Sequence, residues 1–125
     1  MIIEINTQSQ QPIYEQLRDQ LVMGIATGEL EPGEALPSVR ALAADLGINF
    51  HTVSKAYSML CDEGYLVMDR RKGAVVALAA ACSEEFHANL SHRLVLSAAE
   101  AVCHSISESQ FLALCAGSYK SALAK

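Results

Sequence analysis

The chain has 125 residues, which suits one compact domain or one domain with a short appendage. Hydrophobic residues make up 51% of it, but no apolar run approaches the roughly 20 residues that a membrane-spanning helix needs, so we expect a cytoplasmic protein with no membrane partner. The net charge of −5 argues against a nucleic-acid-binding protein, unless the basic residues are gathered in one place.

Residues 12–27 have the pattern of an amphipathic helix. Pro12 stands where the start of a helix tolerates proline, and Gly28 favours a helix end. Residues 31–34, Glu-Pro-Gly-Glu, have the composition of a turn. The apolar residues between these signals recur at every fourth position, which predicts one buried stripe: Ile13, Leu17, Leu21 and Ile25.

Residues 38–63 predict two helices joined by a tight connection. Ser38 is a good N-cap for a helix over residues 39–46, and Gly47 favours its end. Asn49 caps a longer helix that runs to about residue 63. Because so few residues separate the two helices, a steep crossing is more natural than an antiparallel pair, as in a helix-turn-helix.

Two β-prone runs follow, over residues 65–68 and 74–77. The charged turn between them ends in glycine and reads Asp-Arg-Arg-Lys-Gly, which predicts a β-hairpin with a basic tip. Five of the nine Lys and Arg residues fall within residues 40–72, so this stretch carries +1 and the rest of the chain −6. The basic charge therefore lies where a DNA-facing helix and a wing would be.

Beyond residue 78 the composition shifts to Ala, Ser and Cys. Ser83 is a good N-cap followed by two acidic residues, and Ser107 with Gln110 has the pattern of a capping box. Apolar residues repeat at helical spacing after each cap, so we expect a hairpin of two amphipathic helices. Two such helices bury little surface by themselves, and we expect their apolar faces to meet another chain.

The remaining motifs predict neither a metal site nor an enzyme. The four cysteines form no C-x-x-C pair, and we expect reduced, mostly buried thiols. The tail histidines lack the i, i+4 spacing that places ligands on one helical face, so we expect no metal and no cofactor: His87, His92 and His104. Because the chain has no GxSxG, HExxH or phosphate-loop motif, we do not expect an enzyme.

An ordered series of short motifs begins at residue 36. It reads Leu-Pro-Ser-Val-Arg-Ala-Leu-Ala from there, then Leu-Gly-Ile-Asn from residue 46, Thr-Val-Ser-Lys-Ala-Tyr from residue 52 and Glu-Gly-Tyr-Leu from residue 63. Over about residues 10–77 this series resembles the GntR family of bacterial transcription regulators. The short tail is similar to that of the YtrA-type branch of this family.

The resemblance implies a mainly α protein with a small β-hairpin. We expect a winged helix-turn-helix domain over residues 10–78 and a helical hairpin for dimerisation over residues 79–125. The implied function is that of a homodimeric repressor that binds a near-palindromic operator in double-stranded DNA. In this branch the repressed operon often encodes a transporter. The operator sequence, the regulated genes and the existence of a small-molecule effector stay open. The expected dimer interface comprises Phe86, Leu90, Leu94, Phe111, Leu114 and Cys115.

The residues expected to contact DNA lie on the two helices of the helix-turn-helix and at the hairpin tip. Backbone N–H groups and arginine side chains at a helix start bind phosphate, and the first turn of the recognition helix enters the major groove. Cations at the hairpin tip reach phosphates or the minor groove, the alternative being a solvated charged turn. The residues are Ser38, Arg40, Asn49, Phe50, His51, Thr52, Ser54, Lys55, Arg70, Arg71 and Lys72.

Four of these helix residues have competing interpretations. Asn49 either caps its helix alone or contacts DNA as well, and His51 either contacts the groove or is an ordinary exposed histidine. Arg40 either contacts DNA or is a surface arginine paired with Asp45. Phe50 departs from the family pattern, in which Pro or Arg is usual, and it either touches a thymine methyl group or packs on the neighbouring helix. Together with the net charge of −5, Phe50 also leaves room for another function class, a winged helix that binds a protein and no DNA.

Overall fold

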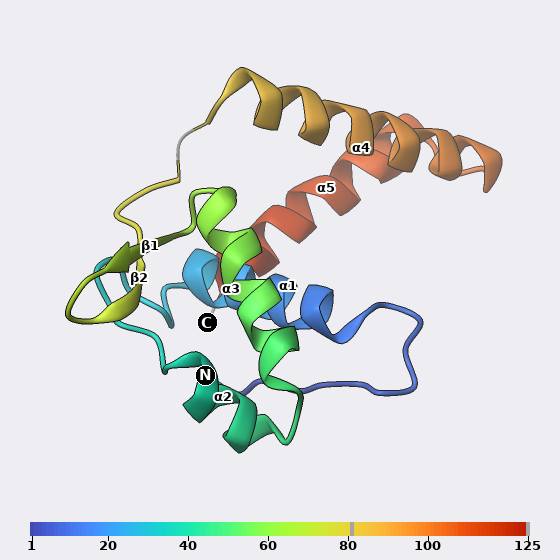
Figure 1. The fold of residues 1–125 in the computed structure, drawn as a ribbon. Helices are drawn as coiled ribbons and strands as arrows, with labels where there is room; N and C mark the ends of the chain where they lie inside the picture. The colour runs from blue at the N-terminus through green and yellow to red at the C-terminus, as the bar shows by residue number, and fades with distance from the viewer. Residues whose placement is uncertain (81, 125) are drawn as a thin grey trace. The chain divides into compact units, whose positions relative to one another are not determined.

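The computed structural model describes residues 1–80 and 82–124, which form one compact unit each (Figure 1). The order of elements confirms the predicted fold class, a mainly helical protein with a β-hairpin after the helix-turn-helix and two C-terminal helices. The first unit contains three helices and two strands, and the second contains two helices. Their bounds are α1 Ile13–Thr27, α2 Val39–Leu46, α3 Phe50–Asp62, β1 Leu66–Asp69, β2 Gly73–Val76, α4 Glu84–Cys103 and α5 Glu108–Leu123.

Capping residues set the bounds of α2 and α3 where the sequence predicted them. Ser38 Oγ accepts a hydrogen bond from a backbone N–H in the first turn of α2 (3.1 Å), and Asn49 Oδ1 accepts one from the N–H of His51 (2.7 Å). Gly47 follows α2 with a φ of 66°, a left-handed conformation that side chains with a Cβ disfavour. The predicted tight connection between the two helices is therefore confirmed.

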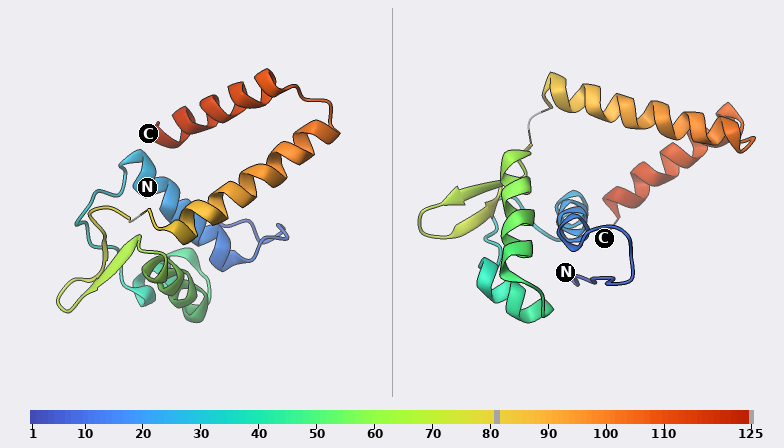
Figure 2. Two further views of the ribbon diagram at one scale, coloured as in Figure 1. Left: turned by 90° about the horizontal axis from the view of Figure 1, so that it is seen from above. Right: turned by 45° about the vertical axis from the view of Figure 1, so that its right-hand side comes forward.

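The core of the first unit forms around α3, which packs on α1, α2 and β1 (Figure 2). Leu17 on α1 and both Val53 and Leu60 on α3 are fully buried. Because the buried side of α3 is held in this way, the helix presents its first turn at a fixed place on the surface. The other buried apolar residues of the unit are Leu21, Leu30, Leu36, Leu42, Ala43, Ala56, Tyr57, Leu66, Ala74 and Val76.

The hairpin of β1 and β2 has a third backbone partner, residues 34–36, which the sequence analysis missed. The N–H of Leu36 donates to the C=O of Ala74 (2.8 Å), and the N–H of Val76 donates to the C=O of Glu34 (2.9 Å). This short segment leads directly into α2. Backbone hydrogen bonds thus join the base of the hairpin to the start of the helix-turn-helix.

A buried tyrosine joins α3 to the same segment. Tyr57 is 5% exposed, and its hydroxyl donates a hydrogen bond to the backbone C=O of Pro37 (2.7 Å). Burial raises the pKa of Tyr57 from its ordinary value of 10.0 to about 12. The hydrogen bond fixes the residue directly before the N-cap of α2.

The raised pKa of Tyr57 predicts a loss of stability at alkaline pH. Between pH 10 and 12 the unfolded chain releases the Tyr57 proton while the folded chain keeps it, so the free energy of unfolding falls as the pH rises through this window. We expect a loss of about 2 to 3 kcal/mol from this group. Urea unfolding of the wild type and Tyr57→Phe at several pH values measures it as a difference, which should be flat below pH 10. Equal slopes for the two proteins above pH 10 would contradict the assignment.

The N-terminal segment lies along α1 and is held by two glutamines that are one helical turn apart. Gln16 is 7% exposed; its Oε1 accepts from the N–H of Asn6 (2.9 Å), and its Nε2 donates to the C=O of Asn6 (2.9 Å) and of Gln11 (2.8 Å). Gln20 pairs in the same manner with the N–H and C=O of Glu4. Side chains of α1 thus form hydrogen bonds with the backbone N–H and C=O groups of alternate residues in the N-terminal segment.

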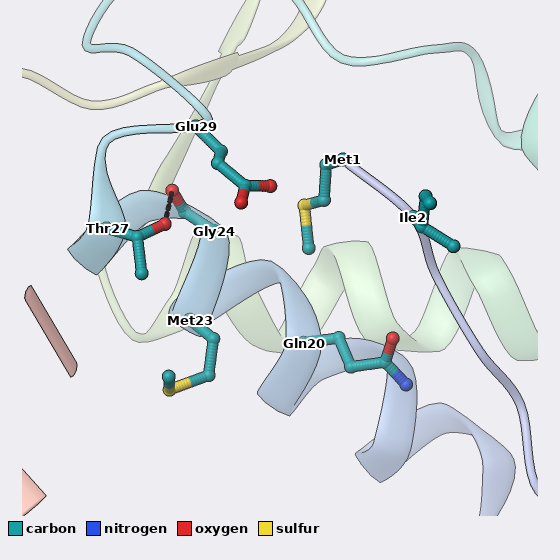
Figure 3. Close-up of a pocket in the computed structure, with 7 residues that line it drawn as sticks. All are labelled: Met1, Ile2, Gln20, Met23, Gly24, Thr27 and Glu29. Carbon is teal, nitrogen blue, oxygen red and sulfur yellow. Dashed lines mark hydrogen bonds between the residues drawn. The ribbon is translucent and has the colours of Figure 1, made fainter. Parts of the chain in front are cut away.

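A shallow pocket lies between this segment and the C-terminal half of α1 (Figure 3). Met1 lies close to α1 at Gly24. A Cβ atom added to this glycine would be 2.5 Å from the Met1 sulfur atom, so a larger residue at this position would clash with Met1. Thr27 closes the helix locally by donating to the C=O of Gly24 (3.2 Å). The pocket is lined by Met1, Ile2, Gln20, Met23, Gly24, Thr27 and Glu29.

The second unit consists of two helices without a core of their own. Ser83 caps α4, and Ser107 with Gln110 forms the predicted capping box at α5. The helices meet near their connection and diverge from it (Figure 2). Among residues 82–124, Ala101 alone is buried. Neither of these helices, nor any other in the described part of the chain, is long and apolar enough to cross a membrane.

The expectation of mostly buried cysteines is wrong. Cys82 and Cys103 are exposed, and Cys61 and Cys115 are half-buried; all four are free thiols. The reason is that three of them belong to the unit that has no core. Within residues 1–80 and 82–124, no group of three His, Cys, Asp or Glu side chains is arranged to hold a metal ion.

Candidate nucleic-acid interface

The exposed first turn of α2 carries Arg40. The ion pairs formed by the described residues join Arg18 to Asp19 and to Glu63, so none of them holds Arg40 to Asp45. The Arg40 guanidinium instead lies over the ring of Phe50, with its central carbon 5.0 Å from the ring centroid. This distance falls within the range of a cation–π interaction.

The first turn of α3 brings Phe50 and His51 to the surface beside Arg40. Phe50 is 39% exposed, and its ring meets the His51 ring edge to face, with centroids 5.4 Å apart and an interplanar angle of 80°. Of the two interpretations of Phe50, this packing matches contact with the neighbouring helix. The three side chains form one cluster, which we call the Arg40 cluster: Arg40, Phe50 and His51.

The other predicted residues of α3 and its cap lie at different depths. Asn49 is exposed, and its side-chain oxygen accepts the capping hydrogen bond of α3. Thr52 and Ser54 are half-buried. Lys55 is exposed, but its ammonium lies 3.9 Å from the centroid of the Tyr14 ring on α1. The structure thus places this cation, which was expected to contact DNA, beside the first turn of α1.

The tip of the hairpin presents Arg70, Arg71 and Lys72, all exposed. Asp69 closes the turn, because its Oδ1 accepts hydrogen bonds from the N–H groups of Arg71 (2.8 Å) and Lys72 (3.0 Å). These backbone hydrogen bonds lower the pKa of Asp69. With Asp69 ionised, the three cations leave the tip with a net charge of +2. In Figure 1 the tip extends at the left, away from the helices of its unit.

Arg18 on α1 contacts the segment between α3 and the hairpin, and the sequence did not predict this role. Its guanidinium donates to the carboxylate of Glu63, at the end of α3, and lies 5.6 Å from the ring centroid of Tyr65, just before β1. The hydrogen bond to Glu63 is the main cause that raises the pKa of Arg18. Arg18 and Glu63 are 45 residues apart, so no local signal could have paired them.

The structure therefore gathers part of the predicted DNA-contacting set. Arg40, Phe50 and His51 come together from α2 and α3, and the three tip cations stand on the hairpin. The predicted interface residues of the tail belong to the second unit. Exposed among them are Phe86, Leu90, Leu94 and Leu114. Half-buried are Phe111 and Cys115.

This fold recurs in known proteins. The HTH-type transcriptional repressor YtrA of Bacillus subtilis (strain 168) is 41% identical over 76 residues, which cover 61% of this chain and 58% of that protein, less than two thirds of its length. A solved structure titled as a transcriptional antiterminator from Listeria monocytogenes EGD-e is similar over 100% of this chain and 95% of its own, with a TM-score of 0.92 and 27% identity.

A further solved structure, AraR(DBD) in complex with operator ORX1, is similar over 60% of this chain and 96% of its own, with a TM-score of 0.54 and 26% identity. The sequence pattern of the family described as bacterial regulatory proteins, gntR family, matches residues 13–76, which is just over half of the chain. The chain therefore belongs to the GntR family of bacterial regulatory proteins.

Proposed function

We propose that this protein is a transcriptional repressor that binds double-stranded DNA as a homodimer. The observation that carries the proposal is the exposed pair of helix starts, with Arg40 and His51 on them, next to a hairpin that ends in three cations. Helix starts and arginine side chains bind phosphate, and a recognition helix reads bases with its first turn. The AraR(DBD)–operator complex supports this use of the fold, and the name of the YtrA relative supports repression.

The tail supports the homodimer. α4 and α5 have 20 and 16 residues, yet only Ala101 is buried in the described part of that unit, so their apolar side chains face solvent. Exposed apolar surface on this scale is typical of an interface. We assign the dimer contact to the six tail residues named above. Two identical DNA-binding units related by a two-fold axis call for a near-palindromic operator.

The alternative of a winged helix that binds only protein loses one of its two supports. Phe50 is not a free apolar side chain, because the Arg40 guanidinium lies over its ring. The net charge of −5 is compatible with DNA binding, since the tip of the hairpin carries a local charge of +2. Regulation of a transporter operon stays a prediction that follows from the resemblance to the YtrA-type branch.

The experiment that tests DNA binding is fluorescence anisotropy with the DNA upstream of the protein's own gene. We expect an affinity that falls steeply with salt concentration, because cations on the protein release counterions from phosphates. An unrelated duplex of equal length serves as the control for sequence preference. Absence of salt-dependent binding to either duplex overturns the proposal.

The hairpin tip yields a sharper prediction. Replacing Arg70, Arg71 and Lys72 together by Ala should lower the slope of log affinity against log salt by up to about 3 per hairpin, because each lost phosphate contact removes roughly 0.9. The matched control is Arg70→Lys with Arg71→Lys, which keeps the charge and should keep the slope. An unchanged slope in the triple Ala variant would place the tip away from DNA.

A further inference from the structure

We propose that Phe50 is a positioning residue for DNA binding: its ring holds the Arg40 guanidinium at the crossing of α2 and α3. This inference rests on the proposed function and names the part that Phe50 plays in it. The ring of Phe50 contacts side chains from both helices of the helix-turn-helix.

The geometry shows a side chain held on an already rigid frame. The starts of α2 and α3 are fixed by the caps Ser38 and Asn49, and the connection between the helices is fixed by the left-handed Gly47. On this frame the guanidinium carbon of Arg40 lies 5.0 Å from the Phe50 ring centroid. The long arginine side chain has many rotamers, and the ring restrains it.

Restraint of Arg40 favours binding for an entropic reason. An arginine side chain has many rotamers, and it loses them when it binds a phosphate or a base edge. A guanidinium held on a ring has lost part of that freedom already, while its N–H donors lie in its own plane and stay free for a ligand. An arginine paired with Asp45 would have to break an ion pair first, and the described residues include no such pair.

The competing role for Phe50 is direct contact with a thymine methyl group. Phe50 is 39% exposed, so part of the ring is open to a ligand. The two roles differ in their coupling to Arg40. A positioning residue acts through Arg40 and loses its effect when Arg40 is absent, whereas a base-reading residue keeps its effect in that background.

The test combines the free protein with a double-mutant cycle. In NMR spectra of the free protein, ring currents should displace the Arg40 side-chain resonances, and Phe50→Leu should remove the displacement. On operator DNA at constant salt, we expect Phe50→Leu to weaken binding about 3- to 30-fold in the wild type and not at all in Arg40→Ala. Phe50→Tyr, which keeps the ring face, should restore most of the loss.

Two results overturn the positioning role. One is the absence of any ring-current displacement at Arg40, which is independent of DNA. The other is an equal loss from Phe50→Leu with and without Arg40, which assigns Phe50 to base contact instead. If the wild type binds no DNA, the proposed function fails and the role in DNA binding fails with it, while the NMR result still reports whether the ring holds Arg40. Thermal unfolding of each variant checks that the fold is retained.

Discussion

Ending the chain after Leu78 is expected to yield a folded monomer whose affinity for operator DNA is about 10² to 10⁴ times lower than that of the full chain. The first unit should fold alone, because its buried core comes entirely from residues 17–76. The loss follows from bivalency: in a dimer the second DNA-binding unit meets its half-site at a high effective concentration, and a monomer has no such partner. Sedimentation equilibrium gives the oligomeric state, and fluorescence anisotropy gives the affinity.

Substitutions within the full chain separate the loss of dimers from the loss of tail residues. Leu90 and Leu94 lie one turn apart on α4, so replacing both by Glu places two charges on the apolar face. This variant should behave like the shortened chain. His92→Glu is the matched control, because it adds a charge to the opposite side of the same helix. A shortened chain that remains dimeric would remove the tail from the interface.

Local signals made the helices of this protein predictable. Each helix start after α1 has a serine or asparagine whose side chain caps it: Ser38, Asn49, Ser83 and Ser107. Gly28 and Gly47 end α1 and α2 in left-handed conformations. These interactions connect residues within one turn, so the sequence alone contains both partners.

The hairpin shows where local signals begin to fail. Strands were predicted over residues 65–68 and 74–77, but β1 and β2 extend over residues 66–69 and 73–76. Asp69 pairs with Gly73 across the end of the ladder and closes the turn through its carboxylate. The turn is therefore shorter than its charged composition suggested, because the side chain of Asp69 takes part in it.

Long-range contacts account for the features that sequence reasoning missed. Arg18 pairs with Glu63, which is 45 positions away, and the two helical glutamines bind backbone groups of the segment that precedes α1. The contact of Arg40 with Phe50 belongs to the same class, since it depends on the crossing of α2 and α3. The sequence could name both residues as candidates for DNA contact, but only the fold shows that they touch.

Leu60→Ala is expected to lower the free energy of unfolding by about 2 to 5 kcal/mol. Leu60 is fully buried on α3, where that helix packs on α1 and β1, and its backbone C=O accepts from the N–H of Tyr65 (2.9 Å). Removing its side chain leaves a cavity in the contact that orients the recognition helix. Urea unfolding measures the loss. The exposed Ser58→Ala on the same helix is the control and should change stability by less than about 0.5 kcal/mol.

The effect of Leu60→Ala on DNA binding should differ in kind from that of Arg40→Ala. Small domains are stable by only about 5 to 15 kcal/mol, so the Leu60 variant loses a large part of its stability but keeps the side chains that we propose to contact DNA. Operator DNA is expected to bind only the folded state. At a DNA concentration about 100 times the dissociation constant, it raises the free energy of unfolding by roughly 2.7 kcal/mol. Saturating DNA should therefore raise the melting temperature of Leu60→Ala as much as that of the wild type. The same DNA should raise it less for Arg40→Ala, which is folded but binds more weakly. Equal DNA-induced shifts in the wild type and Arg40→Ala would remove Arg40 from the interface.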